Sequence, residues 1–540
     1  MARPSARPSR TAVKQRHQVI VVGGGPVGVA LAVELGLRGI DCALVERHLS
    51  PQMIPKGQNL TQRTLEHFHF WGIADELRAA RLLPAGYPIG GITAYGNLMS
   101  EYWFAPIGRE ALRSYYFQAN ERLPQYRTEE VLRRRLAGFP NVKSYFGWSA
   151  ETIEQDENGA RVAIAREAGG ERQLLEAEYV VGCDGARSTV REQLGIDRGG
   201  PDFDERMVLA VFRSRELHKG LERFPERTTY RVLHPDLRGY WQFFGRVDVG
   251  EGWFFHAPVP RDTTPESYDF HGLLERAAGF SFSCAFDHVG FWDLRIAVAG
   301  TYQQGRVFIA GDAAHSHPPY GGFGLNSGLE DVVNLGWKLA AALQGWGGER
   351  LLASYGEERR PIFVETGEAM IKGGIEADRA FLERYSPERD RHEFERAWKE
   401  LETNSRWRQQ SYEPHYEGSS VVQGPPNASS SIHGRHSFAA APGHHLVPQP
   451  LSSGRNVFEQ LGRGFTLLAF GAEDGTVHVL ERAASSLRVP LEVVRDGFEG
   501  ERKAYESRLI LVRPDQYVVW VGDEAPKDPA VLMRKVAGVS

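Results

Sequence analysis

The stretch from Gln18 to Arg47 constrains the fold of this chain more than any other. It reads QVIVVGGGPVGVALAVELGLRGIDCALVER, in which a β-branched run leads into glycines, a helical apolar pattern and a second apolar run. This order predicts a strand, a helix and a second strand in about 30 residues. Gly23, Gly25 and Gly28 have the spacing at which a helix N-terminus holds a pyrophosphate. We therefore expect a Rossmann-like nucleotide-binding unit.

Each position of this motif has a mechanical role. The first glycine makes the tight turn, the second lets the backbone approach the pyrophosphate, and the third lets the helix pack closely on the strand. Glu46 ends the second strand 18 residues after Gly28, and we expect it to accept hydrogen bonds from an adenosine ribose, which disfavours a 2′-phosphate there. We also assign the neighbouring Pro26 and Arg47 to the nucleotide site. FAD and NAD share this motif.

Two later segments place carboxylates at strand ends. AEYVVGCDGARSTVREQLGI predicts a strand that ends at Gly182, followed by Asp184 and a helix that begins near Ser188. Asp184 is either a capping residue or a carboxylate at the edge of the sheet, and this segment alone favours neither. GRVFIAGDAAH predicts a buried strand that runs into Gly311 and Asp312, where a carboxylate can reach a ribityl hydroxyl.

The loop after Asp312 is built for close approach of a flat ring. Paired prolines end in Pro319, and the glycines that follow allow a ring to touch the main chain. A helix that starts near Asn326 would point its positive end at a ring that is negative when reduced. We expect a methyl group at Gly322 to disturb ring placement more than folding. We assign Pro319, Gly321 and Gly322 to a catalytic loop, and Gly324, Leu325 and Asn326 to cofactor binding.

Taken together, these segments resemble the class A flavoprotein monooxygenases of the aromatic hydroxylase type, which include para-hydroxybenzoate hydroxylase and phenol hydroxylase. The resemblance spans residues 18 to 390 and includes the DG motif at Asp184 and the GD motif at Gly311 and Asp312. It implies bound FAD, with Gln125 of LPQYRTEEVLRRRL close to the flavin. One position departs from the family: Lys56 stands where relatives have an arginine, and an ammonium cannot copy a bidentate guanidinium.

The resemblance also implies a reaction. NADH or NADPH reduces FAD, the reduced flavin captures dioxygen as a hydroperoxide, and the distal oxygen attacks a phenolic or related aromatic ring. No second GxGxxG distinguishes the two reductants. One alternative is oxygenation of a polyketide or heteroaromatic compound, including Baeyer–Villiger chemistry. A flavin-dependent halogenase lacks support because its WxWxIP stretch is absent, and a remote alternative is an FAD-binding scaffold without catalysis.

Aromatic segments between the DG and GD motifs predict the substrate wall. TTYRVLHPDLRGYWQFFGRV and EGWFFHAPVP have the alternation and turns of antiparallel strands. We expect one face of these strands to line a substrate pocket and the other to carry Phe244 and Phe254. The expected pocket residues are Trp241, Phe243, Trp253 and Phe255. His234 and His256 are candidate bases for a phenol, although a lone histidine is more often structural.

The motifs divide an α/β chain into five parts. The FAD-binding domain takes residues 18–95, 125–205 and 291–390, and an antiparallel-sheet substrate domain takes 96–124 and 206–290. A disordered leader takes 1–17, a charged helix and linker take 391–438, and residues 439–540 resemble the thioredoxin-like domain of phenol hydroxylase. That last domain lacks CxxC, because no cysteine follows Cys284. It is expected to support packing or a homodimer rather than dithiol chemistry.

Composition excludes several classes of partner. The 64 basic and 69 acidic residues give a net charge of −5, so no basic footprint for nucleic acid exists. No apolar run is long enough for a bilayer, and the N-terminus lacks the apolar core of a secretory signal. The three cysteines lie far apart, and we expect no metal site. These features predict a cytoplasmic protein, and the resemblance to aromatic hydroxylases implies that it binds a small aromatic substrate and dioxygen.

Overall fold

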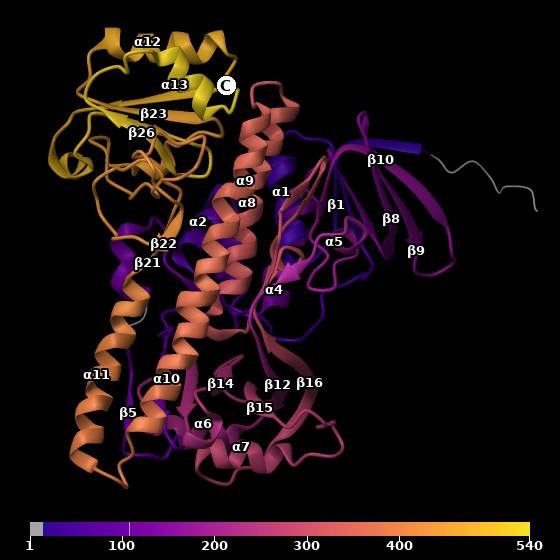
Figure 1. Cartoon of the computed structure of the whole chain (residues 1–540), viewed down its shortest axis with the longest axis vertical. Coiled ribbons are helices and arrows are strands. Elements are labelled where there is room, and N and C mark those ends of the chain that lie inside the picture. The colour runs from indigo at the N-terminus through magenta and orange to yellow at the C-terminus, as the bar shows by residue number, and fades with distance from the viewer. Residues whose placement is uncertain (1–13, 107–108, 540) are drawn as a thin grey trace, which may run out of the picture.

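A computed structural model describes residues 14–106 and 109–539 of the chain (Figure 1). Most of the predicted leader lies outside the described residues, and its last four residues, 14–17, belong to the first strand. The described part is a mixed α/β fold with several sheets. No helix in it is long and apolar enough to cross a membrane.

The first large sheet carries the nucleotide-binding motif. Its strand order is β18-β19-β10-β1-β2-β7, and the hairpin of β8 and β9 extends β10. The strands are β1 (Lys14–Val22), β2 (Cys42–Glu46), β7 (Val142–Phe146), β8 (Trp148–Asp156), β9 (Gly159–Arg166), β10 (Arg172–Gly182), β18 (Gln303–Gln304) and β19 (Val307–Ile309). β19, β10, β1, β2 and β7 run parallel, as the strand-helix-strand pattern predicts. Helix α1 (Pro26–Leu37) packs against both β2 and α8 (Phe323–Leu343).

The second large sheet has the order β16-β12-β15-β14-β13-β4-β5. Its strands are β4 (Gly91–Tyr95), β5 (Trp103–Phe104), β12 (Asp202–Arg213), β13 (Thr229–Leu233), β14 (Gln242–Arg246), β15 (Gly252–Val259) and β16 (Ala285–Arg295). All pairs are antiparallel except β13 with β4. The sheet thus includes residues 91–95 and 291–295, which the division of the sequence placed with the FAD-binding domain. Helices α6 (Arg215–Gly220) and α7 (Phe270–Ala278) cover one of its faces (Figure 1).

Long helices run beside both sheets. Helices α8 and α9 (Glu349–Glu365) pack side by side, and α9 continues through a π-helical segment, residues 366–372, into α10 (Gly373–Arg384) (Figure 1). The predicted charged helix is α11 (Arg391–Gln410). Further helices in this part of the molecule are α2 (Gln62–Phe70), α3 (Ala74–Ala79), α4 (Gln125–Leu136) and α5 (Thr189–Gln193). Short strands pair as β3 (Asn59–Leu60) with β6 (Glu121–Arg122), β11 (Arg198–Gly199) and β20 (His315–Ser316) with β17 (Ala297–Ala299), and β21 (Tyr412–His415) with β22 (Ser431–His433).

The C-terminal part has its own four-stranded sheet in the order β24-β23-β25-β26. Its elements are β23 (Phe465–Phe470), α12 (Asp474–Ser486), β24 (Leu491–Asp496), β25 (Leu509–Val512), β26 (Val518–Gly522) and α13 (Pro529–Val536). β23 and β24 are parallel and the other pairs antiparallel. Buried charges join this part to the helices, because the Arg513 guanidinium donates to both Glu358 oxygens at 2.7 and 2.8 Å. The C-terminal sheet is therefore docked through a desolvated ion pair.

Candidate active site

One large cavity lies between the carboxyl edge of the parallel sheet and the uncovered face of the seven-stranded sheet. Its volume is about 1310 Å³. It brings together most of the residues that the sequence singled out, from the first glycine turn to the aromatic strands. The predicted residues that line it are Gly23, Gly25, Pro26, Glu46, Arg47, Gln125, Asp184, Trp241, Phe243, His256, Asp312, Pro319, Gly321, Gly322, Gly324 and Leu325. The cavity does not include Gly28, His234, Trp253, Phe255, Gly311 or Asn326.

The glycine turn has little room for side chains where it packs and ample room where it faces the cavity. A Cβ on Gly28 would lie 1.8 Å from the carbonyl oxygen of Gly23, and one on Gly23 would lie 2.4 Å from the carbonyl oxygen of Cys183. A Cβ on Gly25 would meet nothing within 4 Å. Gly25 is also the N-cap of α1, and no side chain caps that helix. The helix N-terminus is thus open toward the cavity, as phosphate binding requires.

The rim beside this turn is held by backbone hydrogen bonds. The two carboxylate oxygens of Glu46 accept from the backbone N–H groups of Gly24 at 2.6 Å and His48 at 2.7 Å. Arg133 of α4 donates to the carbonyl oxygen of Gly24 at 3.3 Å, and its Nε is buried without a partner in the described structure. Arg133 was not among the predicted site residues. Its position eight residues after Gln125 puts both on one face of α4, which was the available signal.

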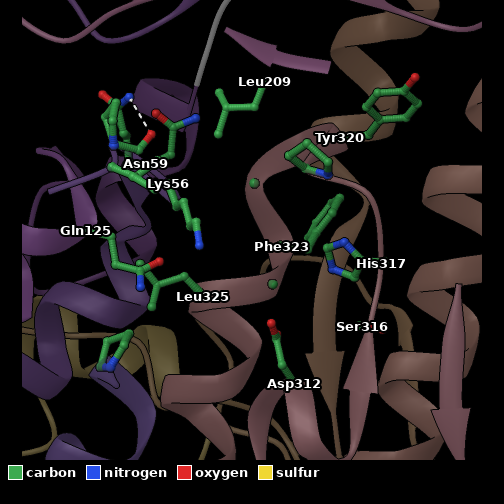
Figure 2. A pocket seen from close by; sticks show the side chains of 18 of the residues that line it. Lys56, Asn59, Gln125, Leu209, Asp312, Ser316, His317, Tyr320, Phe323 and Leu325 are labelled. Atoms are coloured by element: carbon green, nitrogen blue, oxygen red, sulfur yellow. Dashed lines mark hydrogen bonds between the residues drawn. The ribbon is translucent and has the colours of Figure 1, made fainter. Parts of the chain in front are cut away.

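Two aspartates face the same space with unequal partners. Asp184 Oδ2 accepts from the backbone of Val190 at 3.1 Å, whereas its Oδ1 is buried and has no partner among the described atoms. Burial raises the pKa of the Asp184 carboxyl. Asp312 also lines the cavity, and desolvation raises the pKa of its carboxyl, an effect that His315 and, more weakly, Lys56 oppose. Lys56 itself extends into the cavity, between Gln125 and Phe323 (Figure 2).

The loop between Asp312 and α8 contains two consecutive left-handed glycines. Gly321 has a φ of +75° and Gly322 a φ of +69°. An alanine at either position would be strained, so a methyl at Gly322 should disturb folding as well as the placement of a ring. Helix α8 begins at Phe323, three residues before the predicted start, with Gly322 as its N-cap and no side-chain cap. Its open N-terminus faces the cavity, because Phe323, Gly324 and Leu325 all line it.

Asn326 anchors this loop from behind instead of lining the cavity. Its amide nitrogen donates to the carbonyl oxygens of Asn59 at 2.8 Å and Gly322 at 2.7 Å. Its amide oxygen accepts from the backbone of Thr61 at 2.9 Å and from the Thr64 hydroxyl at 2.6 Å. Gly311 also lies behind the surface, where its N–H donates to buried Asp331 at 3.0 Å. Both residues therefore position the loop, which differs from the direct cofactor contact that we predicted.

The aromatic wall uses a different set of rings from the one predicted. Phe243 pairs with His256, and Phe244 pairs with Phe255 across β14 and β15. Directly paired residues of antiparallel strands share a face, so Trp253 and Phe255 lie with Phe244 in the core under α6 and α7. Phe254 lines the cavity. The prediction was wrong for Trp253, Phe255 and Phe254 because it placed the two strands one residue out of register.

Neither histidine is suited to take a proton from a substrate in the cavity. His234 lies outside the cavity, where its Nδ1 accepts from the backbone of Asp236 at 3.2 Å. His256 lines the cavity, but burial lowers its pKa to about 4. Its Nδ1 also accepts from the indole N–H of Trp292 at 3.3 Å. His256 is therefore a neutral, hydrogen-bonded part of the wall at physiological pH.

Arg231 of β13 is a cation on this wall that was not among the predicted site residues. It donates to buried Asp378 at 3.1 Å, and its guanidinium lies 4.4 Å from the ring centre of Trp241. The Trp241 indole donates to the same carboxylate at 2.6 Å, and its ring stacks on Tyr320 at 4.4 Å. These contacts link the wall of β13 and β14 to the glycine loop.

The residues present fit a flavin dinucleotide. Two uncapped helix N-termini open onto one cavity, and the glycine turn leaves backbone exposed. Asp184 Oδ1 and Arg133 Nε are buried polar atoms that have no partner among the described residues. The cavity also exceeds the range of about 300–1,000 Å³ that one small ligand occupies, so it has room for a cofactor and a substrate. Fold and cavity together define an FAD-dependent oxidoreductase.

Comparison with known proteins identifies the family of the chain. The FAD binding domain family matches residues 16–368, and the family described as aromatic-ring hydroxylase, C-terminal, matches residues 439–539. The chain belongs to the FAD-dependent aromatic-ring hydroxylases, and it is an aromatic monooxygenase that uses FAD.

The chain is similar to curated and structurally solved relatives over nearly its full length. 4-Methyl-5-nitrocatechol 5-monooxygenase of Burkholderia sp is 29% identical over 565 residues, with 98% of each chain covered. Rifampicin monooxygenase of Streptomyces venezuelae is 31% identical over 521 residues, with 94% of this chain and 96% of the relative covered. The ternary complex of aklavinone-11 hydroxylase with FAD and aklavinone has a TM-score of 0.81 at 25% identity, covering 97% and 99%.

Proposed function

We propose that the chain hydroxylates a phenolic ring of a polycyclic aromatic substrate, held between the glycine loop and the aromatic strands. The observation that carries this proposal is the face formed by Trp241, Phe243 and Phe254, which lines the same cavity as Gly321 and Gly322. Flat apolar rings bind aromatic substrates by stacking and edge contacts. NADH or NADPH is the reductant, and dioxygen supplies the inserted atom.

The FAD contacts are part of this proposal. Gly23, Gly25, Pro26 and the N-terminus of α1 would hold the pyrophosphate, and Glu46 would hold the adenosine ribose. Asp184 and Asp312 would accept hydrogen bonds from the remaining hydroxyls, with Arg47 and Gln125 beside them. Gly324 and Leu325, in the first turn of α8, would meet the pyrimidine edge of the ring, where the helix dipole stabilises negative charge. Bound FAD supplies the hydride acceptor and the oxygen-transfer chemistry.

The chain's own residues orient the substrate and stabilise its ionised form. Arg231 is a permanent cation at the aromatic wall, so we propose that it stabilises the phenolate, which is more nucleophilic than the phenol. His256 keeps the wall in place through Trp292 and does not take the proton, because its pKa of about 4 leaves little basicity at pH 7. The loop from Pro319 to Gly322 excludes water from the reacting face.

A polyketide or heteroaromatic substrate is the second candidate, and the cavity volume favours it. A space of about 1310 Å³ exceeds the range of about 300–1,000 Å³ that is usual for the site of one small ligand. Relatives of this chain include a tetracenomycin A2 monooxygenase-dioxygenase of Streptomyces glaucescens, 28% identical over 565 residues. We propose a fused-ring phenol as the substrate class that satisfies both candidates. The thioredoxin-like arrangement of the C-terminal part, a homodimer and a cytoplasmic location remain predictions.

A substrate panel tests the proposal. Single-ring phenols, fused-ring phenols and non-phenolic ketones would be compared for stimulated NAD(P)H oxidation, with product identification by mass spectrometry. Fused-ring phenols should give the highest kcat/KM and gain one oxygen on the ring. Insertion of oxygen into a carbon–carbon bond would instead support Baeyer–Villiger chemistry. A double variant, Arg231→Gln with Asp378→Asn, should move the rise of activity with pH toward higher pH if Arg231 stabilises the phenolate, and an unchanged profile would refute that role.

A further inference from the structure

A cluster of histidines and glutamates lies where the linker meets the C-terminal part. His415 ends β21, Glu417 follows two residues later, and His444 comes from the segment before β23. Each of the three offers one ligand atom, and these atoms lie within 4.8 Å of one another. His415 is buried, and the other two are half-buried. The mechanism proposed above uses none of them.

His444 lies between two carboxylates. Its Nε2 is 2.9 Å from a carboxylate oxygen of Glu417, and its Nδ1 is 3.2 Å from one of Glu413. The rings of His415 and His444 stack with centres 4.8 Å apart and planes 10° apart, so the His415 ring has to turn before both rings direct a nitrogen lone pair at one point. Two further atoms are buried without a partner in the described structure: Nδ1 of His415 and the second carboxylate oxygen, Oε2, of Glu413. Both residues are 93% buried, with an exposed fraction of 7%.

The backbone holds the two segments together without help from these side chains. The N–H of Tyr416 donates to the carbonyl oxygen of Gly443 at 2.7 Å. A Cβ on Gly443 would lie 2.4 Å from the backbone nitrogen of Glu417, and its φ is +90°. The segments therefore approach as closely as a glycine allows, and the ligand atoms are brought near one another by the fold.

We propose that His415, Glu417 and His444 bind one divalent metal ion with the ligand preferences of Zn²⁺. Two imidazoles and one carboxylate are a common zinc ligand set, with a fourth position left for water. Glu413 would accept from the second ring nitrogen of His444, which fixes the tautomer that leaves Nε2 free for the metal. Binding replaces any proton on Nε2 of His444, and that proton is released to solvent.

The position of this site gives it a structural role. Tyr412, at the start of β21, lines the active-site cavity, and its ring lies 4.8 Å from that of Phe323 in the first turn of α8. An ion that clamps β21 to the segment at His444 would fix the strand that supports this contact. The zinc site thus ties the linker and the C-terminal part to the wall of the active site.

Zinc binding to the untagged, full-length holoenzyme tests the proposal. Equilibrium dialysis with metal analysis should find one Zn²⁺ per chain, and Co²⁺ should give the intense visible absorption of a tetrahedral site. Glu417→Gln, at a half-buried position, should weaken binding at least tenfold, and so should His444→Gln. His478→Gln is the matched control, because His478 is an exposed histidine of α12.

Zn²⁺ should also raise the melting temperature of the wild-type protein and of the control, and leave that of Glu417→Gln unchanged. Two results would overturn the proposal. The first is no stoichiometric zinc in the folded wild-type protein. The second is equal binding by wild type, Glu417→Gln and His444→Gln, which would mean that other surface groups hold the metal.

Discussion

A single methyl group at Gly324 separates the loop's role in FAD binding from its role in folding. Gly324 lies in the first turn of α8 and, unlike Gly321 and Gly322, has no positive φ. A Cβ built on it meets only one side chain within 4 Å, the ring of His317 at 3.7 Å, which is an ordinary contact. Gly324→Ala therefore fits the protein itself, and the added methyl occupies the cavity surface.

The structure fixes the sign of each effect. Alanine in place of glycine in a helix favours folding by up to about 0.5–1 kcal/mol, so the apoprotein should melt at the same temperature or slightly higher. A methyl in a closely packed cofactor contact costs about 1–3 kcal/mol, or roughly 5- to 150-fold in the dissociation constant of FAD. Gly322→Ala should instead destabilise the fold. Its φ of +69° strains the backbone by about 1–2 kcal/mol with or without cofactor.

The assay compares both variants with wild type. Apoprotein melting would be measured beside FAD affinity, by fluorescence titration, and hydrogen peroxide released per NAD(P)H consumed. Gly324→Ala should keep its melting temperature, lose FAD affinity and release more peroxide. Unchanged FAD affinity and unchanged coupling in Gly324→Ala would refute the claim that the flavin ring lies against this turn.

Three further outcomes are expected. Asp312→Ala should weaken FAD binding by about 1–3 kcal/mol, and a purified variant with full FAD content would count against its assignment. Arg513→Met removes a partner of the buried Glu358 carboxylate and should lower the free energy of unfolding by about 3–5 kcal/mol, measured with denaturant. Arg495→Met removes an exposed ion pair and should lower it by less than about 0.5 kcal/mol. Equal losses in the two variants would refute this. Burial raises the pKa of Glu129 from 4.5 to about 7. The folded apoprotein thus binds this proton more tightly than the unfolded chain does, so its free energy of unfolding should fall as the pH rises from about 4.5 through 7. The fall should be less steep in Glu129→Gln. Identical slopes in wild type and variant would contradict the raised pKa.

The parts of the site that were predictable are those formed within one continuous segment. Gly25 and Glu46 belong to one strand-helix-strand unit, where local spacing determines which atoms face the ligand. Gly321 and Gly322 likewise form a local turn. The geometry of such motifs can be predicted locally, because the backbone conformation of a turn and the position of a helix N-terminus depend on residues close in sequence.

The aromatic wall depends on pairing between strands, and this is where the prediction from alternation failed. Alternation correctly separated Trp253 and Phe255 from Phe254, but it did not say which of the two sets lies on the same face as Phe243. A shift of one residue in the register exchanges the faces completely. The register is set by the β14–β15 connection and by the helices that cover the core face.

The docking of the C-terminal part could not be predicted from the sequence for a related reason. Arg513 and Glu358 are 155 residues apart, and each in isolation has the composition of a solvated surface charge. Their burial follows from the docking of the loop after β25 beside α8 and α9, where Lys338 donates to the same carboxylate at 2.8 Å. Removing the C-terminal part would expose this carboxylate and the apolar surface of Trp337, which packs on Phe465. A chain truncated near Ala440 should therefore lose solubility, so a catalytic role for this part has to be tested by point variants in the full-length enzyme.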